Sequence, residues 1–386
     1  MKPILLVPIA GKGQRFVDDG FHMPKPLIMV DDKHIIDWSF LSINKDEYDV
    51  VFVVRKEHVY NFGMDTILKN KFGNDIKIVE TNKVTSGTVA SCLLAKDFIN
   101  NEQQLVIYTL DVHFQKQFSM NDVEAESDGF ILTFKANNPA YSYVELNEDG
   151  LVLRTAEKEV ISENAAVGIY YFKEGSTFVK YAEEMIDKNL RTNNEFYVCP
   201  LYNLMIKNGL KVTTAQVDKM YLMGTPNELN FFKNNVNKHF GEKPIALCSD
   251  HSGFELKEIT KQILDEKGLK YIDFGTYVKK DCDYNDYVKQ VTQFIQDKYC
   301  DFGFVFCRSG QGVNMAANKQ KGIRSSLISD EWTAEMAVRH GCSNVFAFSE
   351  KNIDKDLMEK CIDKIQHNTF DGGRHINRVQ RLNENL

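Results

Sequence analysis

Proline and tryptophan are scarce in this sequence, which has 8 proline and 2 tryptophan residues among 386. So little proline excludes long proline-rich linkers and collagen-like structure. No run of about 18 uncharged apolar residues occurs, so we expect no transmembrane helix. The apolar start of the chain is short, is interrupted by Lys12 and Arg15, and has no processing site after it. We therefore interpret it as a buried strand and not as a secretory signal.

An excess of positive charge is also missing, because 47 Lys and Arg residues face 54 Asp and Glu residues and give a net charge of -7. This balance argues against a protein that binds nucleic acid or lies on an anionic membrane, although local phosphate sites remain open. The 8 cysteines are irregularly spaced, and no pair has zinc-finger spacing. We expect a reduced, cytoplasmic protein.

Short apolar runs recur along the chain, each followed by a glycine-rich or polar break and then a helical pattern. Five of them are Ile4–Ile9, Val50–Val54, Leu105–Leu110, Ile245–Cys248 and Phe302–Phe306. Continuous apolar runs of this length are typical of strands covered on both faces, as in parallel sheets. Helical stretches such as 254–267 alternate with these apolar runs and give a βαβ pattern. Both halves are therefore predicted to be α/β and doubly wound.

The polar segment 231–244 is the best candidate for a domain boundary, because it ends with glycine and proline close together. Directly after it, the run from Ile245 restarts the strand pattern as though a new protein began. We therefore predict two domains, residues 1–240 and residues 244–386, both of ordinary size.

The first strand leads into a glycine-rich loop, Ala10-Gly11-Lys12-Gly13-Gln14-Arg15. Glycines let the backbone approach an anion closely, and the forked Arg15 side chain suits phosphate oxygens. The loop lacks the Gly-Lys-Ser/Thr ending of a Walker loop and the third glycine of the dinucleotide fingerprint. Taken alone, it is equally consistent with a structural turn.

A lysine between two prolines follows, in Pro24-Lys25-Pro26, and the prolines restrict the directions in which Lys25 can point. The loop and this segment together resemble the sugar-phosphate nucleotidyltransferases, also called nucleotide-sugar pyrophosphorylases. The resemblance covers about residues 1–235 and implies a nucleotide-diphospho-sugar transferase fold, similar to GT-A. It implies that Arg15 helps to hold the triphosphate and that Lys25 offsets charge on the attacked α-phosphate. It further implies nucleotide-binding roles for Ala10, Gly11, Gly13, Gly87 and Thr88.

Asp111 follows a predicted buried strand, where a carboxylate can hold Mg²⁺ or simply cap a helix. The resemblance implies that it is a catalytic metal ligand. By the same resemblance, the sugar phosphate is bound by Glu157, Lys158, Val167 and Gly168. Many family members have a second acidic ligand where this chain has Leu222. Either one ligand suffices, another group such as Glu195 helps, or catalysis is weakened.

In the second half, a predicted strand ends at Cys307 beside the loop Arg308-Ser309-Gly310-Gln311-Gly312. A cysteine at this place, next to a helix N-terminus, lies where a thiolate and an anion are both stabilised, although most buried cysteines are structural.

With Asp250-His251-x-Gly-Phe, Asp283-Tyr284 and Gly372-Gly373-Arg374-His375-x-x-Arg378, the Cys307 loop resembles type B ribose-5-phosphate isomerases and their galactose-6-phosphate isomerase relatives. The resemblance spans about residues 244–386 and implies a Rossmann-like fold without a metal. Cys307 would be the base, with Asp250 and His340 assisting ring opening. The implied sugar-phosphate contacts are His251, Tyr284, Ser309, Gly310, Gly312, Arg374 and Arg378.

Three positions depart from that family. Arg308 stands where glycine is usual, Asn285 replaces a proline, and Gly341 follows His340 where an asparagine is common. The catalytic cysteine, aspartate and histidine are all present, so we predict isomerase activity. Arg308 can add a substrate contact or a second anion site.

The main hypothesis is a bifunctional enzyme that uses a nucleoside triphosphate and sugar phosphates, with Mg²⁺ in the first domain and no cofactor in the second. The fusion suggests one pathway, such as the making of an activated sugar for a capsule or other surface glycan. The alternative is a nucleotidyltransferase whose second domain serves dimerisation or sugar-phosphate sensing. We expect a homodimer or higher homo-oligomer through the carboxyl-terminal domain, and neither nucleic acid nor membrane as a partner.

Overall fold

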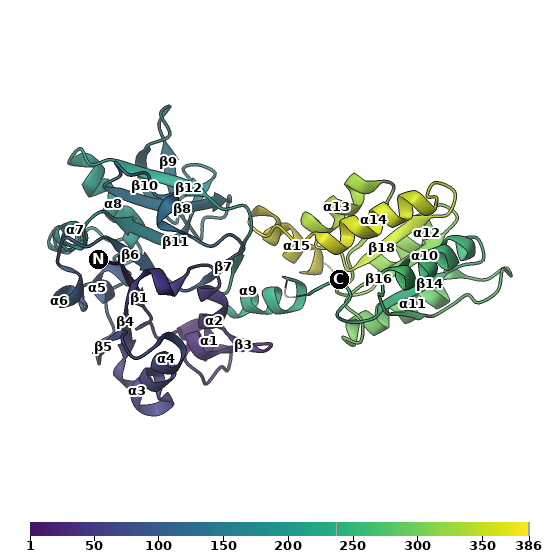
Figure 1. Cartoon of the computed structure of the whole chain (residues 1–386), viewed down its shortest axis with the longest axis horizontal. Helices are drawn as coiled ribbons and strands as arrows, with labels where there is room; N and C mark the ends of the chain where they lie inside the picture. Colours follow the sequence, from purple (N-terminus) through teal and green to yellow (C-terminus); the bar gives the residue numbers. More distant parts are fainter. Residues whose placement is uncertain (237, 385–386) are drawn as a thin grey trace. The chain divides into compact units, whose positions relative to one another are not determined.

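The chain forms two compact units in this computed structural model, Met1–Asn230 and Phe231–Leu386 (Figure 1). The structure describes residues 1–236 and 238–384. Within these ranges, no helix is both long and apolar enough to cross a bilayer. Each unit has its own sheet and its own hydrophobic core, so the two are described separately.

The first unit is built on a nine-stranded mixed sheet with the path β10-β9-β11-β6-β1-β4-β5, in which β8 also pairs with β11 and β12. The strands are β1 (Ile4–Pro8), β4 (Asp49–Arg55), β5 (Lys77–Thr81), β6 (Leu105–Tyr108), β8 (Gly129–Lys135), β9 (Ser142–Leu146), β10 (Val152–Glu157), β11 (Asn164–Phe172) and β12 (Val212–Gln216). The α/β class is confirmed. The expectation of parallel strands holds for β6, β1, β4 and β5, whereas β11 runs antiparallel to β6, β8 and β9. Strands β9 and β10 also pair antiparallel, because the connection between them is too short for a parallel crossover.

Helices cover both faces of this sheet, because alternate side chains of each central strand point to opposite faces. Leu5 and Val7 belong to one core cluster, and Ile4 and Leu6 belong to the other. The helices are α1 (Gln14–Asp18), α2 (Ile35–Phe40), α3 (Lys56–Phe62), α4 (Met64–Phe72), α5 (Thr88–Leu93), α6 (Lys96–Ile99), α7 (Gly175–Asp187), α8 (Val198–Lys207) and α9 (Pro226–Phe231). Two short ribbons complete the unit, β2 (Met29–Val30) with β3 (Lys33–His34) and β7 (Val112–Phe114) with β13 (Met220–Leu222).

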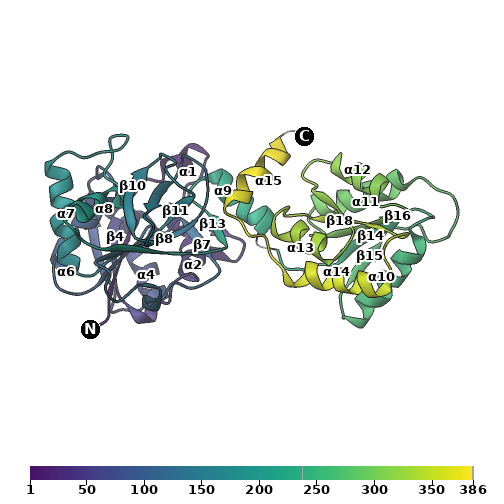
Figure 2. The ribbon, with the colours of Figure 1, turned by 90° about the horizontal axis from the view of Figure 1, so that it is seen from above.

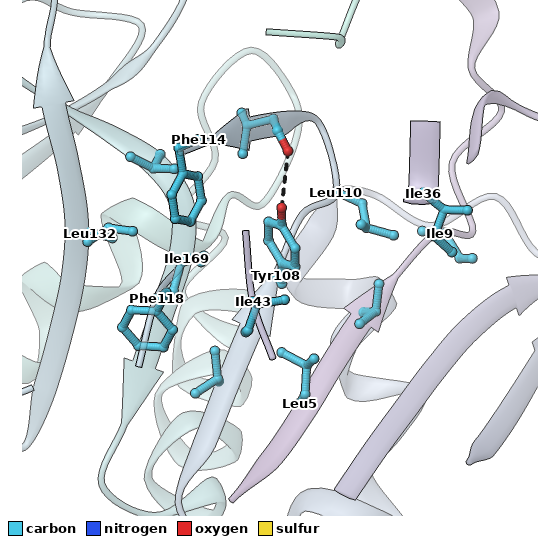
Figure 3. Packing of buried hydrophobic residues seen from close by; sticks show 14 of the residues in the cluster. Leu5, Ile9, Ile36, Ile43, Tyr108, Leu110, Phe114, Phe118, Leu132 and Ile169 are labelled. Carbon is cyan, nitrogen blue, oxygen red and sulfur yellow. Dashed lines mark hydrogen bonds between the residues drawn. The ribbon is translucent and has the colours of Figure 1, made fainter. Parts of the chain in front are cut away.

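Tyr108 lies in the middle of one of these clusters and fixes the end of β6 (Figure 3). Its hydroxyl lies 2.8 Å from the carbonyl oxygen of Ser39 and 3.1 Å from that of Val112. The strand ends here, two residues before the predicted end at Leu110, because Leu110 adopts the left-handed region with φ 53°. This turn brings the next residue, Asp111, to the rim of the sheet.

The second unit is a five-stranded, fully parallel sheet with the order β15-β14-β16-β18-β17. Its strands are β14 (Ile245–Ser249), β15 (Tyr271–Asp273), β16 (Gly303–Cys307), β17 (Ser325–Ile328) and β18 (Val345–Ser349). The strand order reverses between β14 and β16, and open α/β sheets bind ligands outside the carboxyl ends of the strands at such a point. The Rossmann-like prediction is confirmed for this unit.

Five helices of the second unit lie on both sides of its sheet, as Figure 2 shows. They are α10 (Phe254–Glu266), α11 (Tyr284–Gln296), α12 (Gln311–Asn318), α13 (Glu331–Arg339) and α14 (Lys355–His367), and α15 (Arg374–Glu384) follows them in the chain. Residues of α10, α13 and α14 pack with Phe304 and Phe346 on one face, and residues of α11 and α12 pack with Val305 and Ala347 on the other. The unit is therefore doubly wound.

Candidate functional site

A cavity of about 410 Å³ opens in the first unit, where the loop after β1 meets the segment around Lys25 and the turn after β6. Several residues predicted from the sequence line it, namely Gly11, Gly13, Arg15, Lys25, Thr88 and Asp111. Glu195, considered from the sequence as a helper of Asp111, and Gly224 also line it. A volume of this order suits a small ligand.

Lys25 is held at the wall of this cavity. It begins the short 3₁₀ turn Lys25–Leu27, directly after Pro24, and its side chain is only 17% exposed. The ammonium group donates a short hydrogen bond to Asp111 Oδ1. The left-handed Gly13 is so close that a Cβ there would lie 3.5 Å from Cβ of Lys25. The glycine-rich loop, the lysine and the carboxylate therefore meet in one place.

Glu228 is an acidic neighbour of Asp111 that the sequence reasoning missed. A Cβ placed on Gly224 would lie 3.2 Å from Glu228 Oε2 and 3.4 Å from Asp111 Oδ2, so both carboxylates face this glycine. Burial, followed by the charge of Asp111, raises the pKa of Glu228. The sequence Thr225-Pro226-Asn227-Glu228 indicates a helix cap, and the Glu228 N–H does donate to Thr225 Oγ1 at 3.2 Å. The capping pattern does not reveal a second feature of Glu228, its position beside Asp111 and Gly224, two residues that line the cavity.

Of the remaining predicted nucleotide-binding residues, Thr88 lines the cavity, whereas Ala10 and Gly87 do not belong to its lining. Ala10 is 3% exposed and packs in the core, and Gly87 precedes α5 and touches the backbone of Phe196. Thr88 is the first residue of α5 and faces the cavity. Ala10 and Gly87 therefore shape the loop through their backbones.

Glu157 and Lys158 form a cluster with Tyr197, which the sequence reasoning did not single out. Lys158 donates to the Tyr197 hydroxyl at 2.9 Å, and Ser142 donates a short hydrogen bond to Glu157. Burial raises the pKa of Tyr197, and the hydrogen bond and charge of Glu195 raise it further. The cluster thus lies within electrostatic reach of a cavity residue.

Val167 and Gly168 differ in what they can contact. Val167 is 2% exposed, and its side chain belongs to the core. The Gly168 carbonyl oxygen accepts a hydrogen bond from the Thr109 N–H at 3.0 Å, and Thr109 lines the cavity. In this region the Gly168 backbone contacts a cavity residue, whereas the Val167 side chain lies in the core.

In the second unit, Cys307 and Asp250 lie side by side at the carboxyl ends of β16 and β14. The Asp250 N–H donates to the Phe306 carbonyl oxygen at 3.2 Å. Both residues are buried, with Asp250 8% exposed and Cys307 5% exposed. Asp250 Oδ1 accepts hydrogen bonds from the N–H groups of Ser252 and Gly253 at 2.9 and 2.8 Å. The backbone hydrogen bond to Phe306 therefore holds the Asp250 loop at the end of β16.

The loop after Cys307 leads into α12 and packs against Tyr284. Gly310 is the residue before α12 and adopts φ 72°. A Cβ on Gly312 would lie 2.8 Å from the Tyr284 ring. Ser309 is exposed at the start of this turn. The predicted residues Ser309, Gly310, Gly312 and Tyr284 thus gather next to Cys307.

His251 belongs to the same edge of the sheet. Its Nδ1 accepts a hydrogen bond from the Cys282 N–H at 3.2 Å and lies 3.3 Å from Asp281 Oδ1. Both neighbours lie at Nδ1, so Nε2 is the ring nitrogen left to contact an anion.

His340 lies elsewhere, at the carboxyl end of α13. Its ring stacks on His375 with centroids 4.1 Å apart, and its Nε2 lies 3.6 Å from Asp371 Oδ2. Arg374 donates to His375 Nε2 at 3.4 Å, and Arg378 lies one turn further along α15. Burial, followed by the charges of His340 and Arg374, lowers the pKa of His375 to about 4.

The chain does not bring His340 and Cys307 together. Helix α13 connects the carboxyl end of β17 to the amino end of β18, so His340 lies near the amino edge of the sheet. Cys307 ends β16 at the carboxyl edge. Strands of five residues separate the two edges by roughly 15 Å. The predicted isomerase residues therefore form two groups in one chain.

Comparisons with known proteins identify both units. Residues 2–214 match the family described as Nucleotidyl transferase, and residues 245–382 match the family described as Ribose/Galactose Isomerase. Ribose-5-phosphate isomerase B of Escherichia coli is 34% identical over 140 residues, which are 36% of this chain and 94% of that protein.

Two solved structures are also similar. The nucleoside-diphosphate-sugar pyrophosphorylase of Vibrio cholerae has a TM-score of 0.54 and 22% identity, covering 59% of this chain and 99% of its own, and shows the fold of the first unit. A ribose 5-phosphate isomerase of Thermotoga maritima is 38% identical with a TM-score of 0.37, covering 37% of this chain and 99% of its own. Both matched families are families of enzymes. The chain therefore belongs to the nucleotidyl transferase family through residues 2–214, and a ribose/galactose isomerase domain at residues 245–382 is fused to it.

Proposed function

We propose that the chain is a bifunctional enzyme, which transfers a nucleotidyl group to a sugar phosphate in its first unit and interconverts aldose and ketose phosphates in its second. The observation that carries the first activity is the meeting of Lys25, Asp111 and the glycine-rich loop in one cavity. The observation that carries the second is Cys307 beside Asp250 at the switch point of a parallel sheet.

In the first unit, the loop from Ala10 to Arg15 holds the triphosphate, and Lys25 offsets the charge that develops on the α-phosphate. A sugar-phosphate oxygen attacks the α-phosphorus, and the bond to pyrophosphate breaks. This nucleophile is already anionic, so orientation and charge neutralisation do most of the catalytic work. Glu157, Lys158 and Tyr197 supply charge and hydrogen bonds for the sugar phosphate.

Mg²⁺ fits the carboxylates at this cavity. Among the described residues, no group of three or more His, Cys, Asp or Glu side chains is placed to hold a metal ion. Asp111 and Glu228 do provide two carboxylates that converge on Gly224, and Mg²⁺ is typically bound by one or two carboxylates together with substrate phosphates. A bound Mg²⁺ would neutralise phosphate charge. Glu228 would then be the second acidic metal ligand, which many family members carry at the position of Leu222.

In the second unit, Cys307 acts as the base and takes the proton from C2 of the open-chain aldose phosphate. A hydroxyl proton passes from O2 to O1, and the proton taken from C2 returns at C1 as the ketose forms. Asp250 assists opening of the sugar ring, and the backbone of the loop Ser309–Gly312 holds the enediolate. Tyr284 packs on this loop and closes one wall of the site. His251 donates from Nε2 to the phosphate.

A second copy of the chain is needed to complete this site. His340, Arg374 and Arg378 lie at the amino edge of the sheet and are too far from Cys307 of the same chain to share a substrate with it. A homodimer through the second unit, in which His340 of one protomer faces Cys307 of its partner, restores the whole predicted set. His340 then assists ring opening, and the two arginines bind the phosphate.

The fusion favours one pathway, the synthesis of an activated sugar for a capsule or other surface glycan. Isomerases of this type yield a terminal phosphate, whereas most nucleotidyltransferases use an anomeric 1-phosphate. Either a mutase acts between the two steps, or the first unit accepts a terminal phosphate.

One screen tests the proposal. Pyrophosphate release is measured for the common nucleoside triphosphates and dTTP against a panel of sugar phosphates, and aldose–ketose exchange is measured on the same panel. We expect one pair to release pyrophosphate in the presence of Mg²⁺ and one sugar phosphate to be isomerised. The variant Cys307→Ser should lose the exchange, and full exchange by this variant would show that Cys307 is not the base. If the wild-type protein exchanges no pentose or hexose phosphate, the second unit is a dimerisation or sensing module.

A further inference from the structure

Cys307 has a carboxyl group on each side, and only one of them was predicted. Strands β16 and β18 pair with Cys307 opposite Ser349, and the N–H of the next residue, Glu350, donates to the Cys307 carbonyl oxygen at 3.1 Å. On the other side of β16, Asp250 is hydrogen-bonded to Phe306 through its backbone. Asp250 and Glu350 therefore follow the two strands that flank Cys307, at the same edge of the sheet.

One carboxylate oxygen of Glu350 is buried and unused. Among the described residues, no hydrogen-bond donor reaches its Oε2. The nearby charged groups include Lys279, but the Lys279 ammonium donates to Glu255. A buried carboxylate oxygen without a donor is costly, so such an atom at a ligand site indicates a donor that arrives with the ligand.

The two flanking carboxylates differ in what they can still accept. Asp250 Oδ1 already accepts two backbone hydrogen bonds, from Ser252 and Gly253. Glu350 Oε2 accepts none from the described residues. A sugar hydroxyl is an uncharged donor and suits a carboxylate, whereas a phosphate group repels it. Glu350 therefore suits the carbon chain of a sugar phosphate and not its phosphate group.

Arg308 holds this arrangement together. Its carbonyl oxygen accepts hydrogen bonds from Ser349 Oγ at 2.9 Å and from the Lys351 N–H at 3.3 Å, so the Cys307 loop is tied to the end of β18. Its positive charge lies within electrostatic reach of Glu350. The arginine that departs from the family pattern thus lies beside the unexpected glutamate.

We propose that Glu350 is a substrate-contacting residue of the isomerase site, whose Oε2 accepts a hydrogen bond from a hydroxyl group on the carbon chain of the sugar phosphate. This inference rests on the proposed isomerase function. It identifies the part of the substrate that this chain recognises in addition to the phosphate, and it makes Glu350 a determinant of substrate choice.

The test compares full-length Glu350→Gln and Glu350→Ala with the wild type. Calorimetry measures the binding of ribulose 5-phosphate and of inorganic phosphate, and kinetics with the same sugar measure kcat and KM. The matched control is Glu359→Gln on α14, where Glu359 is half exposed and pairs with Lys267 at 3.4 Å. Glu350→Gln preserves side-chain volume and the backbone hydrogen bond to Cys307, so it keeps the test valid if the alanine variant is unstable.

We expect Glu350→Ala to bind ribulose 5-phosphate roughly tenfold more weakly and to raise KM more than it lowers kcat. Glu350→Gln should have an intermediate effect, since its amide oxygen can still accept. Phosphate binding and the control should be unchanged. Unaltered sugar binding in both Glu350 variants, or an equal weakening of phosphate binding, overturns the inference while wild-type isomerisation stands. A wild-type protein that neither binds nor isomerises ribulose 5-phosphate overturns the inference for this probe, and failure across the whole sugar-phosphate panel overturns the proposed isomerase function.

Discussion

The Lys25–Asp111 pair leaves the first cavity close to neutral before any substrate enters. The ammonium group has a carboxylate as its hydrogen-bond partner, and Phe16 lies 5.9 Å from it. In the proposed reaction a triphosphate competes with Asp111 for Lys25, and a cation bound to Asp111 makes this competition easier. The occupancy of one carboxylate would therefore set the availability of the lysine.

Replacing Asp111 and Glu228 one at a time tests each carboxylate as a metal ligand. Asp111→Ala should lower Mg²⁺-dependent pyrophosphate release by roughly 100-fold, because it removes the carboxylate that we propose as the ligand of the cation. Glu228→Gln should weaken Mn²⁺ binding, measured by electron paramagnetic resonance, while the exposed control Glu148→Gln leaves it unchanged. Unchanged pyrophosphate release in Asp111→Ala would contradict the metal assignment, and unchanged Mn²⁺ binding in Glu228→Gln would remove Glu228 from it.

His375 makes the stability of the protein depend on pH. Burial and its positive neighbours hold its pKa at about 4 in the folded protein, below the ordinary 6.5. Between these values the unfolded chain binds more protons, so this contribution to stability is complete above pH 6.5 and is lost as the pH falls toward 4. The fall in Tm between neutral pH and pH 4.5 should be smaller in His375→Asn. The exposed His367→Asn should behave as the wild type does, and an equal fall in all three proteins would argue against this cause.

The sequence was informative about single residues where a motif specifies them. Lys25 between two prolines and Cys307 before a glycine-rich loop were both identified, and the structure places them at a cavity and at a switch point. Glu228, Tyr197 and Glu350 were missed because nothing in their local sequence distinguishes a ligand-facing side chain from a cap or a surface residue. Their positions depend on chain segments brought together only by folding.

The turn between β14 and α10 shows how closely the elements of the second unit are packed. A Cβ on Gly253 would lie 2.5 Å from the Phe306 carbonyl carbon and 2.7 Å from the Cys307 nitrogen. Both are backbone atoms that cannot move aside without disturbing β16. This glycine therefore sets the distance between the Asp250 loop and Cys307.

Gly253→Ala should destabilise the protein by about 3 kcal/mol, because a methyl group must displace backbone in the core of the sheet. Chemical denaturation checks the size of the effect, with the neighbouring Ser252→Ala as a control that adds no atom. Isomerase activity should fall further than folding alone explains, since the Asp250 loop moves away from Cys307. A Gly253→Ala protein with wild-type stability would show that the loop can relax.

Element types were easier to predict than element ends and sheet direction. The apolar runs from Ile4, Val50 and Ile245 all became central strands, because continuous apolar sequence is buried on both faces. The predicted strand to Leu110 ends at Tyr108, because Leu110 adopts a left-handed backbone conformation. No glycine in the sequence indicated this turn. The antiparallel strands around β11 were not predicted, because their direction depends on pairing between distant segments.

For the molecule as a whole, the two groups of isomerase residues predict that two chains share each active site. A mixture of Cys307→Ser and His340→Ala protomers should then recover activity that neither variant has alone. Random pairing in a two-fold dimer gives about a quarter of the wild-type activity, because half of the dimers contain one intact site of two. Refolding or co-expression of the two variants, followed by an exchange assay, measures this. A mixture that stays inactive would indicate that each chain carries a separate site.

The segment before β14 has a consequence for where an isolated second unit can start. Phe240 stacks on Phe304 with ring centroids 5.9 Å apart, and Phe231 lies 5.8 Å from Phe370. Cys342 Sγ donates to the Asn235 carbonyl oxygen at 3.4 Å. Phe231, Asn235 and Phe240 are therefore part of the second unit's packing. A truncated second unit that starts at residue 244 would lose these contacts, so a stable isolated unit should start at Phe231.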